Sequence, residues 1–228
     1  MMRTSVTKST TLTFLLIVGV VLFPVEHVNA RDGAGDVTRV SGRATLTTPS
    51  GDIKPVVKGT RLNSSDIIST SSRSYVRMKL EDSSYIMVRP DSRMKIDDFV
   101  YGSKDAEQDR GFFSLLKGGF RAVSGFIKKK SNYRFQTSKA TIGIRGTEFS
   151  VRVCNFDCYD IDPAPENGLF LEVHDATVIL TNNAGSFTIR QGQYAYVRDA
   201  NTPVVLLDYV PDVFDQKPIP PARPDCQQ

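Results

Sequence analysis

The stretch Lys139-Ala-Thr-Ile-Gly-Ile-Arg-Gly-Thr-Glu-Phe149 says more about the fold than any other part of the sequence. Its β-branched residues alternate with Gly143 and Gly146, and glycine permits positive φ and the close approach of a second backbone. Ile142 and Ile144 can therefore both point inward while the chain bends sharply. We interpret the stretch as a structural corner of a β-sheet, with a partner-docking surface as the alternative.

Two charged residues of this stretch, Arg145 and Glu148, lie three positions apart in the expected bend. They could pair with each other, or Arg145 could bond turn carbonyls with its fixed fork of donors. The candidate site residues of the stretch, for either the structural or the docking interpretation, are Thr141, Gly143, Ile144, Arg145, Gly146, Thr147 and Glu148.

Alternating apolar and polar residues predict β-strands on both sides of this stretch. Tyr75–Leu80 and Ser84–Arg89 alternate cleanly around the turn residues 81–83, which indicates a hairpin or two successive coils. One weak helical window covers residues 111–126, and its glycines count against a long helix. The expected strands cover residues 37–46, 75–80, 84–89, 93–96, 119–123, 133–136, 148–153, 169–173, 176–180, 186–189 and 193–197.

Many short strands with frequent turns predict an all-β fold. Two stretches, from Val40 and from Val173, each run through an Ala-Thr pair and a turn to a later glycine, Gly59 or Gly192. This weak internal echo favours short stacked strands in a β-solenoid or β-roll, with a β-sandwich as the alternative.

The two ends of the sequence differ from this strand texture. A positive start, an apolar run from Leu12 to Val25 and small residues up to Ala30 are typical of a secretory signal peptide, residues 1–30. The run is shorter than the roughly 20 residues that a membrane-spanning helix needs. We therefore expect cleavage near Ala30, no membrane span afterwards, and a mature chain in the periplasm or secreted. Residues 201–228 hold several prolines and are expected to form an extended tail.

Three cysteines follow the expected cleavage site, and two of them lie close together. An extended strand would separate the Cα atoms of Cys154 and Cys158 by roughly 13 Å, whereas a disulfide needs about 4.4–6.8 Å. A turn at residues 155–157 would bring them together, and an oxidising compartment would then favour a bond. Two unpaired thiols are the alternative, and Cys226 is left over.

The Lys139–Phe149 string closely resembles the signature of the FecR domain family. Residues 58–62, 66–70 and 72–86 are similar to the same family, so we expect a FecR-type β domain over residues 31–200. Its core would be residues 35–153, with a looser β extension over 168–200. The resemblance implies an all-β fold outside the cytoplasm. The best-known members regulate iron-dicitrate and siderophore uptake through a cytoplasmic anti-sigma segment, and this chain resembles the exported relatives that carry a FecR domain alone.

Catalytic chemistry is poorly supported by the residues. His174 is the one histidine after residue 30 and is expected to be a surface polar residue. The sequence around His174 does not match a nucleophile elbow, and the sequence contains no glycine-rich phosphate-binding motif. The acidic residues Asp157, Asp160, Asp162 and Glu166 lack EF-hand spacing, so a solvated loop is favoured over calcium. We expect no enzyme, no cofactor and no metal.

The net charge of +4 falls to +3 when Arg3, Lys8 and Glu26 are removed with residues 1–30. So small a charge, without tryptophan, does not indicate nucleic-acid binding. The basic stretch Lys128–Lys130 is expected to protect a sheet edge, with an anionic partner or lipid as the alternative.

These observations favour a non-catalytic protein-interaction or signalling module with a protein partner in the bacterial envelope. One alternative is a structural or assembly protein that uses the tail and Cys226. The other is a carbohydrate- or peptidoglycan-binding domain that stacks sugars on Tyr85, Tyr101, Tyr194 and Tyr196. The oligomeric state stays open.

Overall fold

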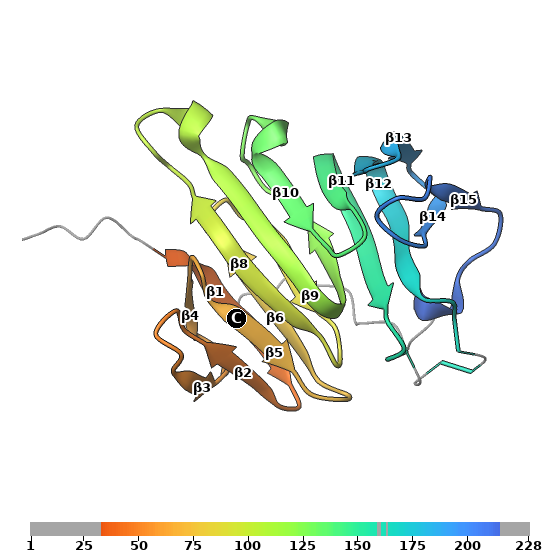
Figure 1. The fold of residues 1–228 in the computed structure, drawn as a ribbon. Helices are drawn as coiled ribbons and strands as arrows, with labels where there is room; N and C mark the ends of the chain where they lie inside the picture. The colour runs from red at the N-terminus through yellow and green to blue at the C-terminus, as the bar shows by residue number, and fades with distance from the viewer. Residues whose placement is uncertain (1–32, 159–160, 163, 215–228) are drawn as a thin grey trace, which may run out of the picture. The chain divides into compact units, whose positions relative to one another are not determined.

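β-strands make up most of the residues that the computed structural model describes, which are 33–158, 161–162 and 164–214 (Figure 1). The fold is 56% strand and 5% helical, which confirms the all-β class. The expected signal peptide, residue Asp160 of the acidic cluster, and the end of the expected tail with Cys226 lie outside the described residues.

Fifteen strands and three short 3-10 helices are described. The strands are β1 (Gly33–Ser41), β2 (Ala44–Thr47), β3 (Ile53–Pro55), β4 (Arg61–Asn63), β5 (Ile67–Thr70), β6 (Tyr75–Leu80), β7 (Tyr85–Val88), β8 (Arg93–Val100), β9 (Arg110–Val123), β10 (Tyr133–Gln136), β11 (Thr141–Cys154), β12 (Gly168–Asn182), β13 (Gly185–Arg190), β14 (Tyr194–Val197) and β15 (Val205–Leu207). The helices are η1 (Ala106–Gln108), η2 (Lys130–Asn132) and η3 (Asp212–Phe214), and none of these described helices is long enough to span a bilayer.

The pairings connect these strands in two orders. The first sheet runs β3-β2-β5-β8-β9-β10-β11-β12-β13, and the second runs β4-β1-β6-β7-β9-β11-β12-β14-β15. All pairs are antiparallel except β9 with β10. Three long strands, β9, β11 and β12, belong to both sheets, and β9, β10 and β11 close into a small ring.

Each shared strand changes sheet at a residue with positive φ. The first half of β9 pairs with β8 and β10, and the second half pairs with β7 and β11. The change falls at Gly118 in β9, at Gly146 in β11 and at Ala176 in β12, where φ is 79°, 66° and 56°. A left-handed residue breaks the pleat, so the strand turns a corner and continues in the other sheet.

One hydrophobic core is shared by both sheets. The alternating inward residues of β6, β8, β9 and β12 belong to the same buried cluster. At its centre the Phe135 ring stacks on Phe113 and Phe120 with centroids 5.0 and 4.8 Å apart, and Phe149 meets it edge-on at 5.3 Å.

The structure differs from the sequence predictions in three places. The solenoid is not confirmed, because shared strands join two sheets whose neighbours are often distant in sequence. The weak helical window is wrong, since residues 110–123 are strand β9. Part of the expected tail, residues 201–214, holds β15 and η3 with Val213 buried. The hairpin over residues 75–88 is present as β6 and β7.

Candidate functional site

The Lys139–Phe149 stretch forms the corner of β11. Ile142 and Ile144 are both buried in the core. Gly143 pairs with Arg134 on one side and Ile179 on the other. A side chain at Gly146 would meet no atom within 4 Å, so its positive φ rather than lack of space calls for glycine there.

Three hydrogen bonds hold this corner in place. The Thr147 hydroxyl donates to the Thr177 carbonyl at 2.8 Å, and its backbone amide donates to the Ser124 hydroxyl at 2.9 Å. The Thr141 hydroxyl donates to the Gln136 side chain at 2.7 Å. These contacts tie β11 to β10, β12 and the end of β9.

The carboxylate of Glu148 is bound by Arg121 of β9, with Nε and Nη2 at 2.8 and 2.6 Å from Oε1. Arg145 lies opposite Thr177 in the strand ladder. Whether its side chain pairs with Glu148 or with turn carbonyls lies outside what the structure describes.

A polar network continues from Arg121 across the outward face of the second sheet. The ring of His174 accepts or donates a 2.8 Å hydrogen bond between Nε2 and the Ser150 hydroxyl, and its Nδ1 lies 3.5 Å from Glu172. Burial, and then the Arg121 charge, lower the pKa of His174 although Glu172 opposes them. His174 is therefore half-buried rather than a free surface residue. Ser150 is only 3% exposed, too enclosed for a nucleophile to meet a substrate.

The predicted Cys154–Cys158 disulfide is present, with Cα atoms 5.5 Å apart. It anchors a second, smaller cluster of buried residues, which also contains Ile161, Phe170, Tyr196 and Val213. The disulfide thus ties the loop after β11 to β12, β14 and η3.

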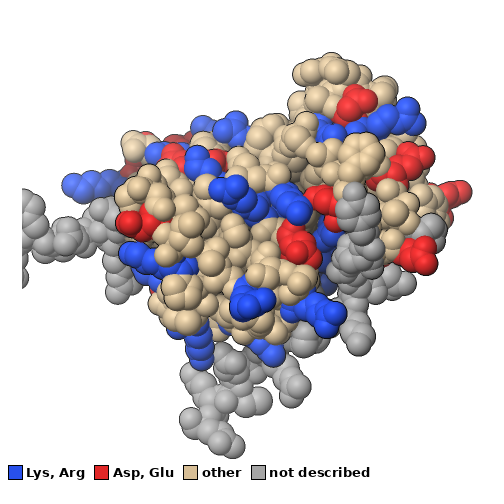
Figure 2. Space-filling view, turned by 60° about the horizontal axis from the view of Figure 1, so that its bottom comes forward, with Lys and Arg blue, Asp and Glu red and all other residues tan. Residues whose placement is uncertain are grey.

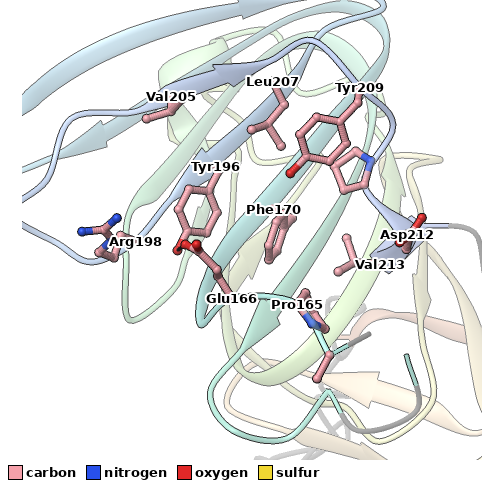
Figure 3. Close-up of a pocket in the computed structure, with 12 residues that line it drawn as sticks. Pro165, Glu166, Phe170, Tyr196, Arg198, Val205, Leu207, Tyr209, Asp212 and Val213 are labelled. Carbon is pink, nitrogen blue, oxygen red and sulfur yellow. Dashed lines mark hydrogen bonds between the residues drawn. The ribbon is translucent and has the colours of Figure 1, made fainter. Parts of the chain in front are cut away.

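Beside this small cluster lies a cavity of about 420 Å³ (Figure 3). It opens on the outward face of β12, β14 and β15, between the 164–166 segment and residues 209–213. Its size falls within the range of ligand pockets. Most of its lining is aromatic or aliphatic: Ala164, Pro165, Phe170, Tyr196, Val205, Leu207, Tyr209, Pro211 and Val213, joined by the charged Glu166, Arg198 and Asp212.

One end of the cavity is organised by Tyr196. Its hydroxyl donates to the Asn167 carbonyl at 2.7 Å and lies 3.1 Å from Glu166. Burial, and then the Glu166 carboxylate, raise the pKa of Tyr196, and Arg198 partly offsets them. The ring of Phe170 packs against Tyr196 with centroids 5.0 Å apart. Tyr196 is thus fixed as a wall of the cavity.

The outward face of the same sheet is basic and aromatic at β6 and β7. Arg77 lies 5.1 Å over the Tyr85 ring and Lys79 lies 5.7 Å over it, while Arg39 of β1 covers Tyr75 at 5.8 Å. The strand registers place Arg39, Arg77, Met87 and Arg121 side by side in one row across four strands. In Figure 2 acidic side chains are more frequent on the right, which is the side of β12–β15 in Figure 1.

The other candidate residues are not brought into one site. Of the four tyrosines proposed for sugar stacking, Tyr196 lines the cavity, Tyr194 donates to Glu172 at 3.3 Å, and Tyr85 lies under two cations. Lys129 pairs with Glu107 at 3.0 Å. Within the described ranges no three potential ligands gather as a metal site.

Sequence reasoning missed the cavity because its walls come from three separate segments, around Phe170, Tyr196 and Val213. A usable signal was present in the apolar run Val204–Leu207 between a proline and an aspartate, which is typical of a short strand.

Similarity to known proteins is found in solved structures and in a family model. Two crystal structures of a "putative anti-sigma factor" from Parabacteroides distasonis are similar, at 12% and 11% identity with TM-scores of 0.46 and 0.47. Each comparison covers 62% of this chain, and the chain spans only 58% of theirs. No curated protein matches. The family model described as FecR protein matches residues 66–157, from β5 to the disulfide loop, while the cavity lies beyond it. Over residues 66–157 this chain is therefore similar to the FecR family.

Proposed function

We propose that this chain is an exported, non-catalytic protein of the bacterial envelope that acts by binding another protein through the outward face of its second sheet. The FecR match over residues 66–157 carries this proposal, because the family resemblance implies regulators that act by contact outside the cytoplasm.

The chemistry of the face supports protein binding. Tyrosine and arginine are enriched among the residues that dominate protein interfaces. The outward face of β1, β6 and β7 presents both types, in Arg77, Tyr85 and their neighbours. The signature string, by contrast, is used at the β11 corner, where Ile142 and Ile144 are buried.

The disulfide supports export from the cytosol. A Cys154–Cys158 bond persists in oxidising surroundings and is rare in the cytosol. If the protein is exported, its N-terminus in envelope fractions will be Arg31, and this bond will resist thiol-specific labels until it is reduced. An unprocessed protein recovered in the cytosol would rule out the envelope role.

Photo-crosslinking in living cells tests the binding face. A photoreactive phenylalanine analogue replaces Met87, in the middle of the basic row, or Leu116, which is 52% exposed and points outward from the first sheet. We expect a discrete protein adduct at Met87 that is lost with Arg77→Glu, and none at Leu116. Equal adducts at both positions, or none at Met87, would contradict the proposal.

A further inference from the structure

Strand β15 is an open edge of the second sheet. Among the described residues it pairs only with β14 and stands last in the strand order. Proteins usually protect such edges with charges, prolines or bulges. The sequence Val205-Leu206-Leu207 carries none of these, so the only protection of β15 is its length of three residues, and Val205 and Leu206 are each 52% exposed. Its free edge is therefore suited to accept another strand.

The side chains of β15 connect this edge to the cavity. Alternate residues of a strand share a face, and both Val205 and Leu207 line the cavity (Figure 3). Strand neighbours lie about 4.8 Å apart. A strand added beside β15 would therefore place every second side chain on the cavity side, next to Val205 and Leu207, with Tyr196 one strand further in.

The charges around the cavity define what those side chains should be. Two carboxylates, Glu166 and Asp212, line it against one cation, Arg198. Arg198 sits at the Tyr196 end, where Glu166 also lies, and this leaves Asp212 at the other end. A ligand with apolar side chains and one Arg or Lys would complement this lining.

The next part of the chain supplies an aromatic border. Tyr209 and Val210 follow β15 and are 57% and 56% exposed, and Tyr209 also lines the cavity. An exposed tyrosine beside a strand edge offers a large contact area at low entropic cost.

We propose that β15 and the adjoining cavity form a strand-addition site for an extended, basic and apolar peptide segment of a partner protein. This rests on the proposed function and specifies a second surface for it. Main-chain hydrogen bonds to β15 would supply affinity, and the cavity would select the side chains.

A display library of random nine-residue peptides, selected on the full chain, tests the site. We expect the enriched sequences to alternate apolar residues and to carry an Arg or Lys. The best of them, made synthetically, is then titrated against the chain by calorimetry. Methylation of alternate backbone nitrogens in the peptide should abolish binding, because it removes the donors of an added strand.

Matched variants locate the binding. Val205→Asp and Asp212→Lys should each weaken the synthetic peptide at least tenfold, or about 1.4 kcal/mol. Ile53→Asp and Asp52→Lys are the controls, because Ile53 is exposed on the three-residue edge strand β3 of the other sheet. All four variants must keep the Cys154–Cys158 bond and an unchanged melting temperature.

The possible results separate this site from the proposed function. Failure to enrich any peptide, enriched peptides without a basic residue, or equal binding by Val205→Asp overturns the site. Dimerisation of the chain that Val205→Asp abolishes would also overturn it, because a second copy would then occupy β15. The Met87 crosslink is independent of all these results, and its loss alone would remove the proposed function.

Discussion

Gly118 and Gly146 have similar backbone angles but different surroundings. Both have positive φ where a strand changes sheet. A Cβ on Gly118 would come within 2.7 Å of the Asp91 carbonyl and the Ser92 Cα, whereas one on Gly146 would meet nothing. Gly146→Ala should therefore cost only the left-handed penalty of about 1–2 kcal/mol. Gly118→Ala adds overpacking and should cost about 2–5 kcal/mol in total. Urea unfolding of the two variants measures the difference, and equal losses would contradict the assignment of the Gly118 clash.

A second effect of a single residue is that His174 makes the stability of the fold depend on pH. Its folded pKa is below its unfolded value, chiefly because of burial, so the unfolded chain binds more protons. The stability from the neutral ring is present above about pH 6.5 and is lost as the pH falls through the folded pKa. Asp82, whose pKa is raised by burial, acts in the opposite direction. The effect of His174 is therefore measured by comparing a variant with the wild type. Between about pH 7.5 and about pH 5, the melting temperature of His174→Gln should fall less than that of the wild type. Identical losses would show that the ring does not titrate in this way.

Among the elements, the disulfide loop is expected to stabilise the residues packed around it rather than the whole sheet. So small a ring stabilises by about 2 kcal/mol. Replacing Cys154 and Cys158 together by serine should cost about that amount and loosen the cluster of Phe170, Tyr196 and Val213. Hydrogen exchange should then quicken at β14 and η3 while β6 keeps its protection. Cys226→Ser serves as the control for loss of a thiol, and uniform quickening across both sheets would contradict a local role.

Elements were predictable where one strand serves one sheet. β6 and β7 alternate buried and outward residues throughout, so their hairpin could be predicted from the sequence. Only the second half of β9, residues 119–123, was predicted as a strand, because Gly118 resets the alternation and the whole stretch also fits a glycine-rich helical window. The Cys154–Cys158 bond was predictable from the short spacing, the turn residues between the two cysteines and the expected oxidising compartment, whereas the cavity depends on how segments distant in sequence meet.

For the whole molecule, the shared core predicts one cooperative unfolding transition. Phe135 is fully buried and contacts aromatic rings from β9 and β11, which belong to both sheets. Phe135→Ala should cost about 3–5 kcal/mol and shift a single transition. Phe156→Ala, at a position 74% exposed, should change stability by no more than about 0.5 kcal/mol. Circular dichroism and tyrosine fluorescence followed on the same sample should coincide, and two separate transitions would show that the sheets unfold independently.

Because β9, β11 and β12 each run through both sheets, the backbone connects the two sheets covalently at three places. A side-chain period of two means that deleting one residue from such a strand turns every later side chain to the opposite face. Neither sheet can slide along the other without dragging these strands out of pairing on both sides. A mechanical load that a partner applied to one sheet would therefore be borne by its companion as well.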